Sequence, residues 1–237
     1  MMTTGSFFTL LGYLTGGLVF YFAARRKRIA TEGVGYVALA GVCGGVLGAR
    51  LTQWALLHWP DFAANPLVVF DPRAGGRALL GGIAGGWLAV ELVKWRLGLR
   101  RSTGDLFALA LPAGEAVGRI GCFLNGCCHG MPTNVPWAIY QHDTWRHPTQ
   151  IYSAVFAAAL FAVLLALRKR LTKEGVLFKA YLGWYGAGRF VIEFYRADRV
   201  PAGPLSLVQW CCLSMMAYAW LLPLVWKAKI LKERKCR

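Results

Sequence analysis

The stretch Gly118–Gly130, written GRIGCFLNGCCHG, sets one arginine, three cysteines and a histidine within thirteen residues. A guanidinium group binds phosphate through two parallel hydrogen bonds. A cysteine thiolate is a nucleophile and a metal ligand, and a histidine exchanges its proton near neutral pH. The stretch therefore combines a group that can hold an anion with groups that can react.

A second group of charges lies in WYGAGRFVIEFYRAD. Arg189 and Glu193 are four residues apart, and Arg196 follows within the next turn, so all three share one face of a helix. Glu115 and Arg119 repeat the four-residue spacing earlier in the chain. The carboxylates of Glu115 and Glu193 either only neutralise the arginines or take part in function. The arginines are more numerous than these carboxylates require, which favours a binding site for a lipid phosphate.

Two kinds of polar side chain near these charges are candidate catalytic groups. Tyr185 lies one turn before Arg189 and offers a hydroxyl. His147 opens the stretch HPTQIY, where Pro148 fixes the backbone at the start of a helix, and a neutral imidazole there could accept a proton. His129 follows the cysteines and could serve the same purpose.

No metal ion and no cofactor is expected. Zinc sites usually take cysteine pairs from two parts of the chain, and adjacent residues such as Cys127 and Cys128 rarely both bind one ion. Cys122 or Cys128 could form a disulfide with Cys127, the thiols could simply pack, or one could be reactive. The cysteines inside other apolar stretches are expected to be packing residues: Cys43, Cys211 and Cys212.

Composition indicates that membrane helices must position these residues. Of 237 residues, 57% are hydrophobic and only 11 are acidic. The net charge of +16 does not indicate nucleic-acid binding, because the basic residues cluster at the ends of apolar stretches. A bilayer core of about 30 Å needs roughly 20 apolar residues per helix. Seven stretches meet this length, at about 6–24, 34–57, 78–97, 104–124, 149–167, 178–196 and 204–226.

The loops on the two sides of these helices differ in charge. Nineteen lysines and arginines follow the first, third, fifth and seventh helices, against four in the opposite loops. Since basic loops stay in the cytoplasm, the N-terminus is predicted outside and the C-terminus in the cytoplasm. The sequence therefore predicts an all-α polytopic membrane protein with seven transmembrane helices in a single domain, 1–237, and long outward loops at about 58–77 and 125–148.

Charges and glycines inside the predicted helices carry further information. An ion in hydrocarbon is costly, so intramembrane charges are candidate functional groups. They are Arg50, Asp105, Glu115, Arg119, Arg189, Glu193, Arg196 and Asp198. The glycine pairs predict closely packed helices instead. These pairs are Gly44-Gly45, Gly81-Gly82 and Gly85-Gly86.

Together these stretches resemble the prolipoprotein diacylglyceryl transferase family. The resemblance rests on GRIGCFLNGCCHG, HPTQIY and WYGAGRFVIEFYRAD, and is supported by GGRALLGG (75–82), Asp105 and Gly48-Ala49-Arg50. That family transfers diacylglycerol from phosphatidylglycerol to the thiol of a lipobox cysteine in an exported preprotein and releases glycerol phosphate. The resemblance implies a bacterial inner-membrane protein whose active site faces outward, and it agrees with the predicted topology.

The resemblance also implies roles for single residues. Arg119 and Arg189 match the arginines that hold the phospholipid headgroup and stabilise the departing phosphate. The implied catalytic residues are Arg119, Arg189, His147, Tyr185 and Glu193. The implied substrate-binding residues are Asn125, Gly130, Arg196, Arg50, Asp105, Glu115 and His129.

Two departures from the family pattern keep other functions open. Leu80 stands where the family usually has a histidine, so the usual base is absent, and Cys122 and Cys127 stand where it has Asn and Glu. The leading hypothesis is diacylglyceryl transfer from phosphatidylglycerol, or another anionic glycerophospholipid, to an exported preprotein. The second keeps the lipid site but uses another acceptor or moves the headgroup. The third is a non-catalytic lipid-binding or transport protein, and the fourth is a redox protein using the outward cysteines.

Overall fold

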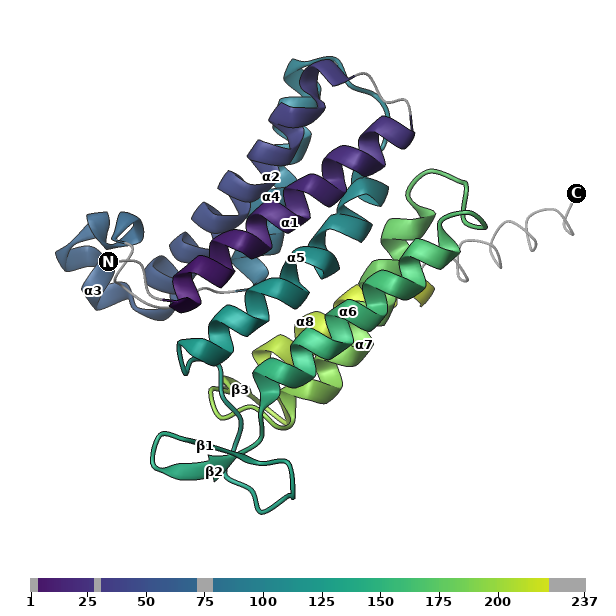
Figure 1. Cartoon of the computed structure of the whole chain (residues 1–237). Helices are drawn as coiled ribbons and strands as arrows, with labels where there is room; N and C mark the ends of the chain where they lie inside the picture. Colours follow the sequence, from purple (N-terminus) through teal and green to yellow (C-terminus); the bar gives the residue numbers. More distant parts are fainter. Residues whose placement is uncertain (1–3, 28–30, 72–78, 222–237) are drawn as a thin grey trace, which may run out of the picture. The chain divides into compact units, whose positions relative to one another are not determined.

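The computed structural model describes residues 4–27, 31–71 and 79–221 (Figure 1). The chain forms two compact units, one made of Met1–Ala23 and Ser102–Arg237 and the other of Ala24–Arg101. Several predicted features lie wholly or partly outside the described residues: Arg28, Arg73, Arg77, the first part of GGRALLGG, the end of the seventh predicted helix and the basic tail.

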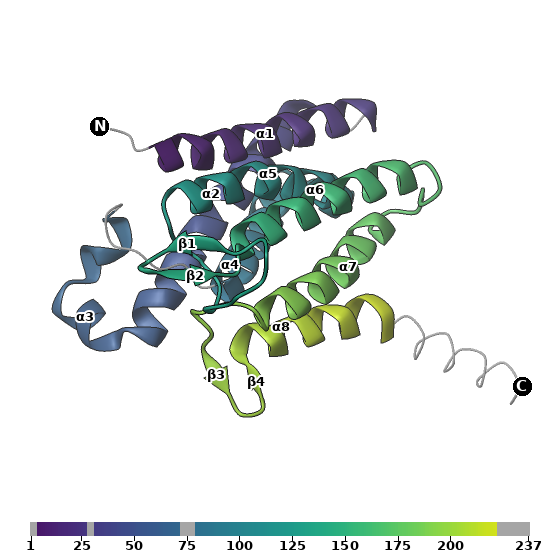
Figure 2. The same ribbon diagram turned by 60° about the horizontal axis from the view of Figure 1, so that its bottom comes forward.

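The larger unit is a bundle of helices. It holds α1 (Thr4–Arg26, the last turn of which extends past the unit), α5 (Gly104–Leu124), α6 (Thr149–Leu167), α7 (Val176–Glu193) and α8 (Leu207–Met216), which continues as the π-helical turn η3 (Ala217–Leu221). Helix α6 packs against α5 and α7, and α7 packs against α8 (Figures 1 and 2). Buried side chains of α5, α6 and α7 form its core: Ala108, Leu109, Leu160, Leu164, Leu177, Tyr181 and Tyr185.

Helices α1 and α5 approach each other through glycines. A side chain on Gly12 would meet the carbonyl oxygen of Gly114 at 2.7 Å, and one on Gly16 would meet that of Ala110 at 3.1 Å. Small residues at such contacts let two helix backbones come together in a membrane protein.

Two hairpins lie at one end of this unit (Figures 1 and 2). Strands β1 (Ile139–Gln141) and β2 (Thr144–Arg146) are antiparallel. They are joined by His142 and Asp143, both with positive φ, as a tight two-residue turn requires. Strands β3 (Pro201–Ala202) and β4 (Leu205–Ser206) connect α7 to α8. The predicted outward loop 125–148 therefore contains a small sheet that the sequence analysis did not anticipate.

The smaller unit is built on a close helix pair. Helix α2 (Thr31–Leu51) packs along α4 (Leu79–Arg96), and a side chain on Gly48 would collide with the backbone of Gly81 and Gly85. This confirms that the glycine pairs mediate close packing. The remaining elements are the π-helical η1 (Thr52–Leu57), α3 (Trp59–Ala64) and the 3-10 helix η2 (Pro66–Phe70).

The fold fits a membrane protein. Four helices among the described residues are long and apolar enough to cross a bilayer: Thr4–Arg26, Gly33–Ala55, Gly104–Leu124 and Thr149–Leu167. Large apolar side chains on these helices are exposed, such as Val155 at 64% and Phe22 at 57%. The structure confirms a mostly helical protein with a helix at each of the seven predicted positions. The number of spans and their orientation stay predictions.

Candidate functional site

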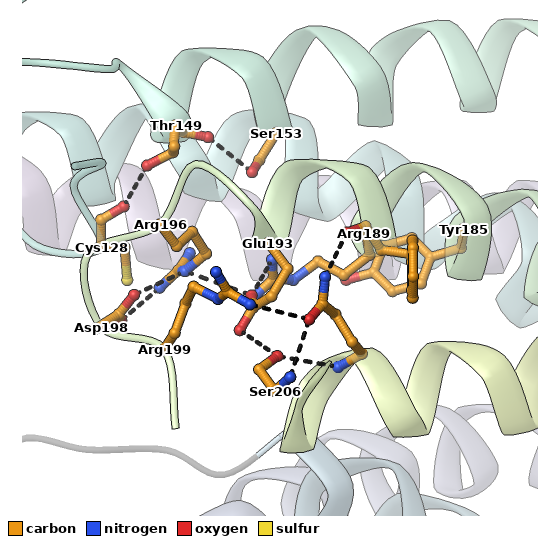
Figure 3. A network of polar contacts seen from close by, with 12 residues as sticks. Cys128, Thr149, Ser153, Tyr185, Arg189, Glu193, Arg196, Asp198, Arg199 and Ser206 are labelled. Carbon is orange, nitrogen blue, oxygen red and sulfur yellow. Dashed lines mark hydrogen bonds and ion pairs between the residues drawn. The ribbon is translucent and has the colours of Figure 1, made fainter. Parts of the chain in front are cut away.

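Glu193 lies at the centre of a buried polar network at the end of α7 (Figure 3). Its Oε2 is 2.7 Å from Arg189 Nη1 and 3.9 Å from Arg196 Nε. Its Oε1 accepts a hydrogen bond of 3.0 Å from the Ser206 hydroxyl. The predicted helix face is confirmed, since both guanidinium groups converge on this one carboxylate.

Arg196 has a second acidic partner beyond the helix. Its Nε and Nη2 donate to the two carboxylate oxygens of Asp198 at 2.8 and 2.6 Å, which is the two-pronged geometry that arginine favours with carboxylates. The Asp198 side chain is 54% exposed, whereas that of Arg196 is 7% exposed. Arg196 therefore links the buried network to the surface of the unit.

Backbone pairing brings the cysteine-rich stretch beside Arg196. The Met131 amide donates to the Tyr195 carbonyl at 2.8 Å, and the Ala197 amide donates to the His129 carbonyl at 3.2 Å. Gly130 lies between these bonds, and its own amide donates to the His147 carbonyl at 3.0 Å. A side chain on Gly130 would collide with the His147 carbonyl oxygen, so only glycine fits this crossing.

A second ion pair lies on α5. The Nε and Nη2 atoms of Arg119 donate to Glu115 Oε1 at 3.0 and 2.9 Å, as the four-residue spacing predicted. The Tyr185 hydroxyl of α7 donates to the same oxygen at 3.4 Å. Tyr185 interacts electrostatically with both Arg119 and Arg189, so it joins the α5 pair to the α7 network.

The start of α6 holds the cysteine-rich stretch in place. The Thr149 hydroxyl donates to the Cys128 carbonyl at 2.8 Å (Figure 3), and the Gln150 side chain donates to the Cys127 carbonyl at 2.9 Å. Both side chains are fully buried. The stretch HPTQIY therefore fixes the backbone from which two cysteines project.

The structure gathers Cys122, Cys127 and Cys128 at one point. Their three sulfur atoms all lie within 4.8 Å of one another. Cys128 adopts φ 62°, a left-handed conformation that few non-glycine residues take, and the sulfur atoms of the adjacent Cys127 and Cys128 lie within this group. Hydrogen bonds with the Cys122 and Cys127 thiols, together with the positive charge of Arg196, lower the pKa of the Cys128 thiol below its ordinary value.

The histidines make their contacts near this stretch. His147 Nδ1 lies 3.2 Å from the Tyr152 hydroxyl, and its ring centroid is 5.0 Å from that of Tyr195. The ring of His129 lies 4.5 Å from that of His142, centroid to centroid. His147 is thus placed beside the segment that carries Arg196.

Three further predicted residues have other surroundings. Asp105, at the opposite end of α5 from Arg119, accepts backbone hydrogen bonds from Gly175 and Phe178 at 3.1 and 3.0 Å. Asn125 ends α5, and its side chain lies against Gly5 of α1. Arg50 belongs to the smaller unit, where it donates to the carbonyls of residues 68, 69 and 71.

The sequence analysis gave no site role to several residues of the network. They are Thr149, Gln150, Arg199, Ser206 and Gln209. One local signal was available, because the spacing S-x-x-Q marks a helix start. Ser206 and Gln209 form such a capping box at α8, with the Ser206 amide donating to Gln209 Oε1 at 2.9 Å.

The structure brings arginines, a tyrosine and cysteine thiols close together in a membrane protein. Comparison with known proteins identifies a family that fits this set of residues. The sequence profile of prolipoprotein diacylglyceryl transferase matches residues 4–226. The chain belongs to the prolipoprotein diacylglyceryl transferase family.

Its relatives named phosphatidylglycerol–prolipoprotein diacylglyceryl transferase include that of Clostridioides difficile, which is 34% identical over 84% of this chain and 80% of the relative. That of Geobacter sulfurreducens is 33% identical over 84% and 82%. That of Idiomarina loihiensis is 36% identical over 74% and 70%. In this member of the family, Arg119 and Arg189 each form an ion pair with a glutamate, and Tyr185 interacts electrostatically with both arginines.

Proposed function

We propose that this protein is a phospholipid-dependent membrane transferase. It moves diacylglycerol from phosphatidylglycerol to a cysteine thiol of an exported prolipoprotein. The relatives' names supply the two substrates. The observation that carries the proposal is Arg189, a residue that is only 8% exposed, pairs with one carboxylate, and interacts electrostatically with Tyr185 beside the Arg119 pair.

The two arginines suit the chemistry of this transfer. The acceptor sulfur attacks the glycerol carbon that carries the phosphate, a carbon–sulfur bond forms, and the carbon–oxygen bond breaks toward the phosphate. The thiol proton passes to a base, for which His147 and His129 are the candidates, and glycerol phosphate departs with the bonding electrons. Fixed guanidinium groups in a site shielded from water stabilise the charge that grows on this phosphate. Arg119 and Arg189 are the groups we assign to that role.

The other predicted site residues fit this arrangement. Glu193 and Glu115 hold the arginines, and Tyr185 offers a hydroxyl between them. Arg196 and Gly130 fix the outer edge of the site, where His147 and His129 lie next to the paired backbone. Asn125, and Arg50 in the smaller unit, keep their proposed roles in substrate binding. Asp105 lies at the far end of α5 and accepts hydrogen bonds from backbone amides at the start of α7, so we propose that it positions this helix end instead.

The predicted topology belongs to the same proposal. A single transmembrane domain of seven helices, with its N-terminus outside and the loops 58–77 and 125–148 facing outward, sets the end of α7 at the outer side of a bacterial inner membrane. An exported preprotein would reach the acceptor side of the site from there.

Mass measurement on a lipobox peptide tests the function. The purified protein is incubated with phosphatidylglycerol and the peptide, and the expected product carries one added diacylglyceryl group. Arg119→Ala and Arg189→Ala should each abolish the addition while the protein stays folded, because a lost transition-state donor costs about 100-fold or more. Arg170→Ala, which removes an exposed arginine between α6 and α7, is the matched control and should retain the rate. Full activity in either site variant would overturn the assignment.

The departures noted above favour one other candidate. Leu80 and the cysteines keep open a transfer from the same lipid site to a different acceptor. Consumption of phosphatidylglycerol without a change in peptide mass would select that candidate, and loss of neither substrate would select lipid binding or transport.

A further inference from the structure

The three-cysteine cluster of Cys122, Cys127 and Cys128 takes no part in the roles assigned so far. Two of its thiols come from one loop and the third from the last turn of α5, and their sulfur atoms lie within 4.8 Å of one another. Their burial is mixed, since Cys127 is exposed and the other two are half-buried. The cluster is therefore accessible to solvent through Cys127, while its other two cysteines are partly enclosed by the protein.

This spacing is close to what one metal ion requires. Zinc binds cysteine sulfur at about 2.3 Å in a tetrahedron, which sets neighbouring sulfur atoms about 3.8 Å apart. The thiols need to close by no more than about 1 Å, which a small rotation of cysteine side chains supplies. Three soft sulfur ligands select a soft or borderline ion such as Zn²⁺.

The backbone under the cluster is already fixed by outer partners. Thr149 and Gln150 bind the carbonyls of Cys128 and Cys127, and the Cys127 amide donates to the Cys122 carbonyl at 3.1 Å. Such outer partners hold metal ligands in position. The left-handed conformation of Cys128 turns neighbouring cysteines toward one point, which a regular helix or strand does not do.

The charges around the cluster match a metal–thiolate group. Three thiolates and one Zn²⁺ carry a net charge of about −1. Arg196 interacts with the sulfur of Cys128, and Arg119 interacts electrostatically with Cys122 and Cys128. The same two arginines border the proposed lipid site, so the cluster lies next to the place where the acceptor sulfur must attack.

We propose that Cys122, Cys127 and Cys128 bind one Zn²⁺, and that the fourth position of this ion takes the thiol of the acceptor cysteine. Three protein ligands with one open position are the arrangement of catalytic zinc. A thiol that coordinates zinc loses its proton, which passes to water, and becomes a thiolate. That thiolate then forms the carbon–sulfur bond as the carbon–oxygen bond of the lipid breaks, and the thioether product leaves the metal. This inference rests on the proposed function, whereas the metal site itself can be tested without turnover.

Metal analysis tests the site. The full-length protein, purified in detergent under reducing conditions and supplied with Zn²⁺, should retain about one zinc per chain after desalting. Cys122→Ser, Cys127→Ser and Cys128→Ser should each weaken zinc binding by roughly 100-fold or more, since even outer-shell changes cost 10–100-fold. Cys43→Ser, which removes an exposed thiol of the smaller unit, is the matched control and should not change zinc content. Absence of zinc from the reduced wild-type protein would overturn the proposal, as would equal zinc in all four variants.

Cobalt substitution tests the fourth position without any variant. Co²⁺ bound to the three thiolates should show sulfur-to-metal absorption, and a lipobox peptide should add a fourth sulfur and change that spectrum. A peptide with serine in place of its cysteine should not do so. No spectral difference between the two peptides would overturn the acceptor role.

Activity separates this inference from the function on which it rests. Removal of zinc by a chelator should lower diacylglyceryl transfer, and added Zn²⁺ should restore it. Undiminished transfer by metal-free protein would overturn the zinc proposal and leave the proposed function intact. Zinc and peptide binding with no transfer would overturn the proposed function and leave the metal site. A disulfide among the three cysteines that, once reduced, still gives no zinc binding would overturn the site.

Discussion

Arg189 and Glu193 are joined by an ion pair within α7, with Nη1 2.7 Å from Oε2 and side chains 9% and 2% exposed. Neither atom makes a hydrogen bond beyond this pair within the described residues. The buried guanidinium of Arg189 is therefore positioned by the single carboxylate of Glu193. Under the proposed function, its remaining nitrogens are the groups expected to bind an anionic headgroup.

Glu193→Gln should lower the free energy of unfolding more than the same change at the surface. Removing one charge of a buried pair leaves its partner uncompensated and costs about 3–5 kcal/mol. Asp198→Asn is the matched control, because Asp198 also binds Arg196 but is 54% exposed, and a surface pair contributes about 1 kcal/mol or less. Thermal unfolding of both variants in detergent micelles measures the difference, and equal losses would contradict the burial argument.

Tyr185→Phe should slow diacylglyceryl transfer while the KM for phosphatidylglycerol changes little. The hydroxyl donates to Glu115 beside Arg119, and a hydrogen bond to a charged group contributes about 1.5–3 kcal/mol, or roughly 10–100-fold in rate. Tyr181→Phe is the matched control, since Tyr181 stacks on Tyr185 one turn earlier. Steady-state rates on the lipobox peptide decide the matter. A Tyr185→Phe enzyme with the wild-type kcat would remove Tyr185 from the catalytic set.

The ion pairs of the site could be predicted from the sequence because they are local. Helix geometry alone sets Glu115 opposite Arg119, and Arg189 opposite Glu193, at four-residue spacing. The helix positions could be predicted for a similar reason, because the length of an apolar stretch can be read from each segment by itself. The close approach of α2 and α4 followed from glycine pairs within them.

The cysteine cluster could not be predicted from local rules. Its geometry depends on pairing between His129–Met131 and Tyr195–Ala197, segments far apart in the chain, and on a left-handed Cys128 whose carbonyl is bound by Thr149. Adjacency of two cysteines argued against a shared site when judged by spacing alone. The small sheet β1–β2 was missed because two three-residue strands give too short an alternation to identify.

Gly130→Ala should disrupt the site, because the neighbouring backbone leaves no space for a side chain at residue 130. The new methyl group would collide with the His147 carbonyl and meet that of Tyr195 at 2.8 Å, and overpacking of this kind costs about 1–3 kcal/mol. Transfer should fall sharply, because Cys128 and Arg196 shift together. Gly17→Ala is the control, since nothing lies within 4 Å of a side chain there, and alanine in a helix should stabilise by about 0.5–1 kcal/mol. Unchanged transfer in Gly130→Ala would show that this crossing does not position the site.

Thr149→Val tests whether the start of α6 positions the cysteine-rich stretch. The change keeps the shape of the side chain but leaves the Cys128 carbonyl without its donor, at a cost of about 1–2 kcal/mol. Backbone amides of residues 128–131 should then exchange with deuterium faster, and transfer should slow, because the left-handed turn at Cys128 loses a stabilising contact. Ser153→Ala is the control, since its hydroxyl only donates to the Thr149 carbonyl one turn earlier within the helix, at 2.8 Å. If exchange in 128–131 is the same in the two variants, the Thr149 bond does not hold the stretch, and the pairing with Tyr195–Ala197 alone must position it.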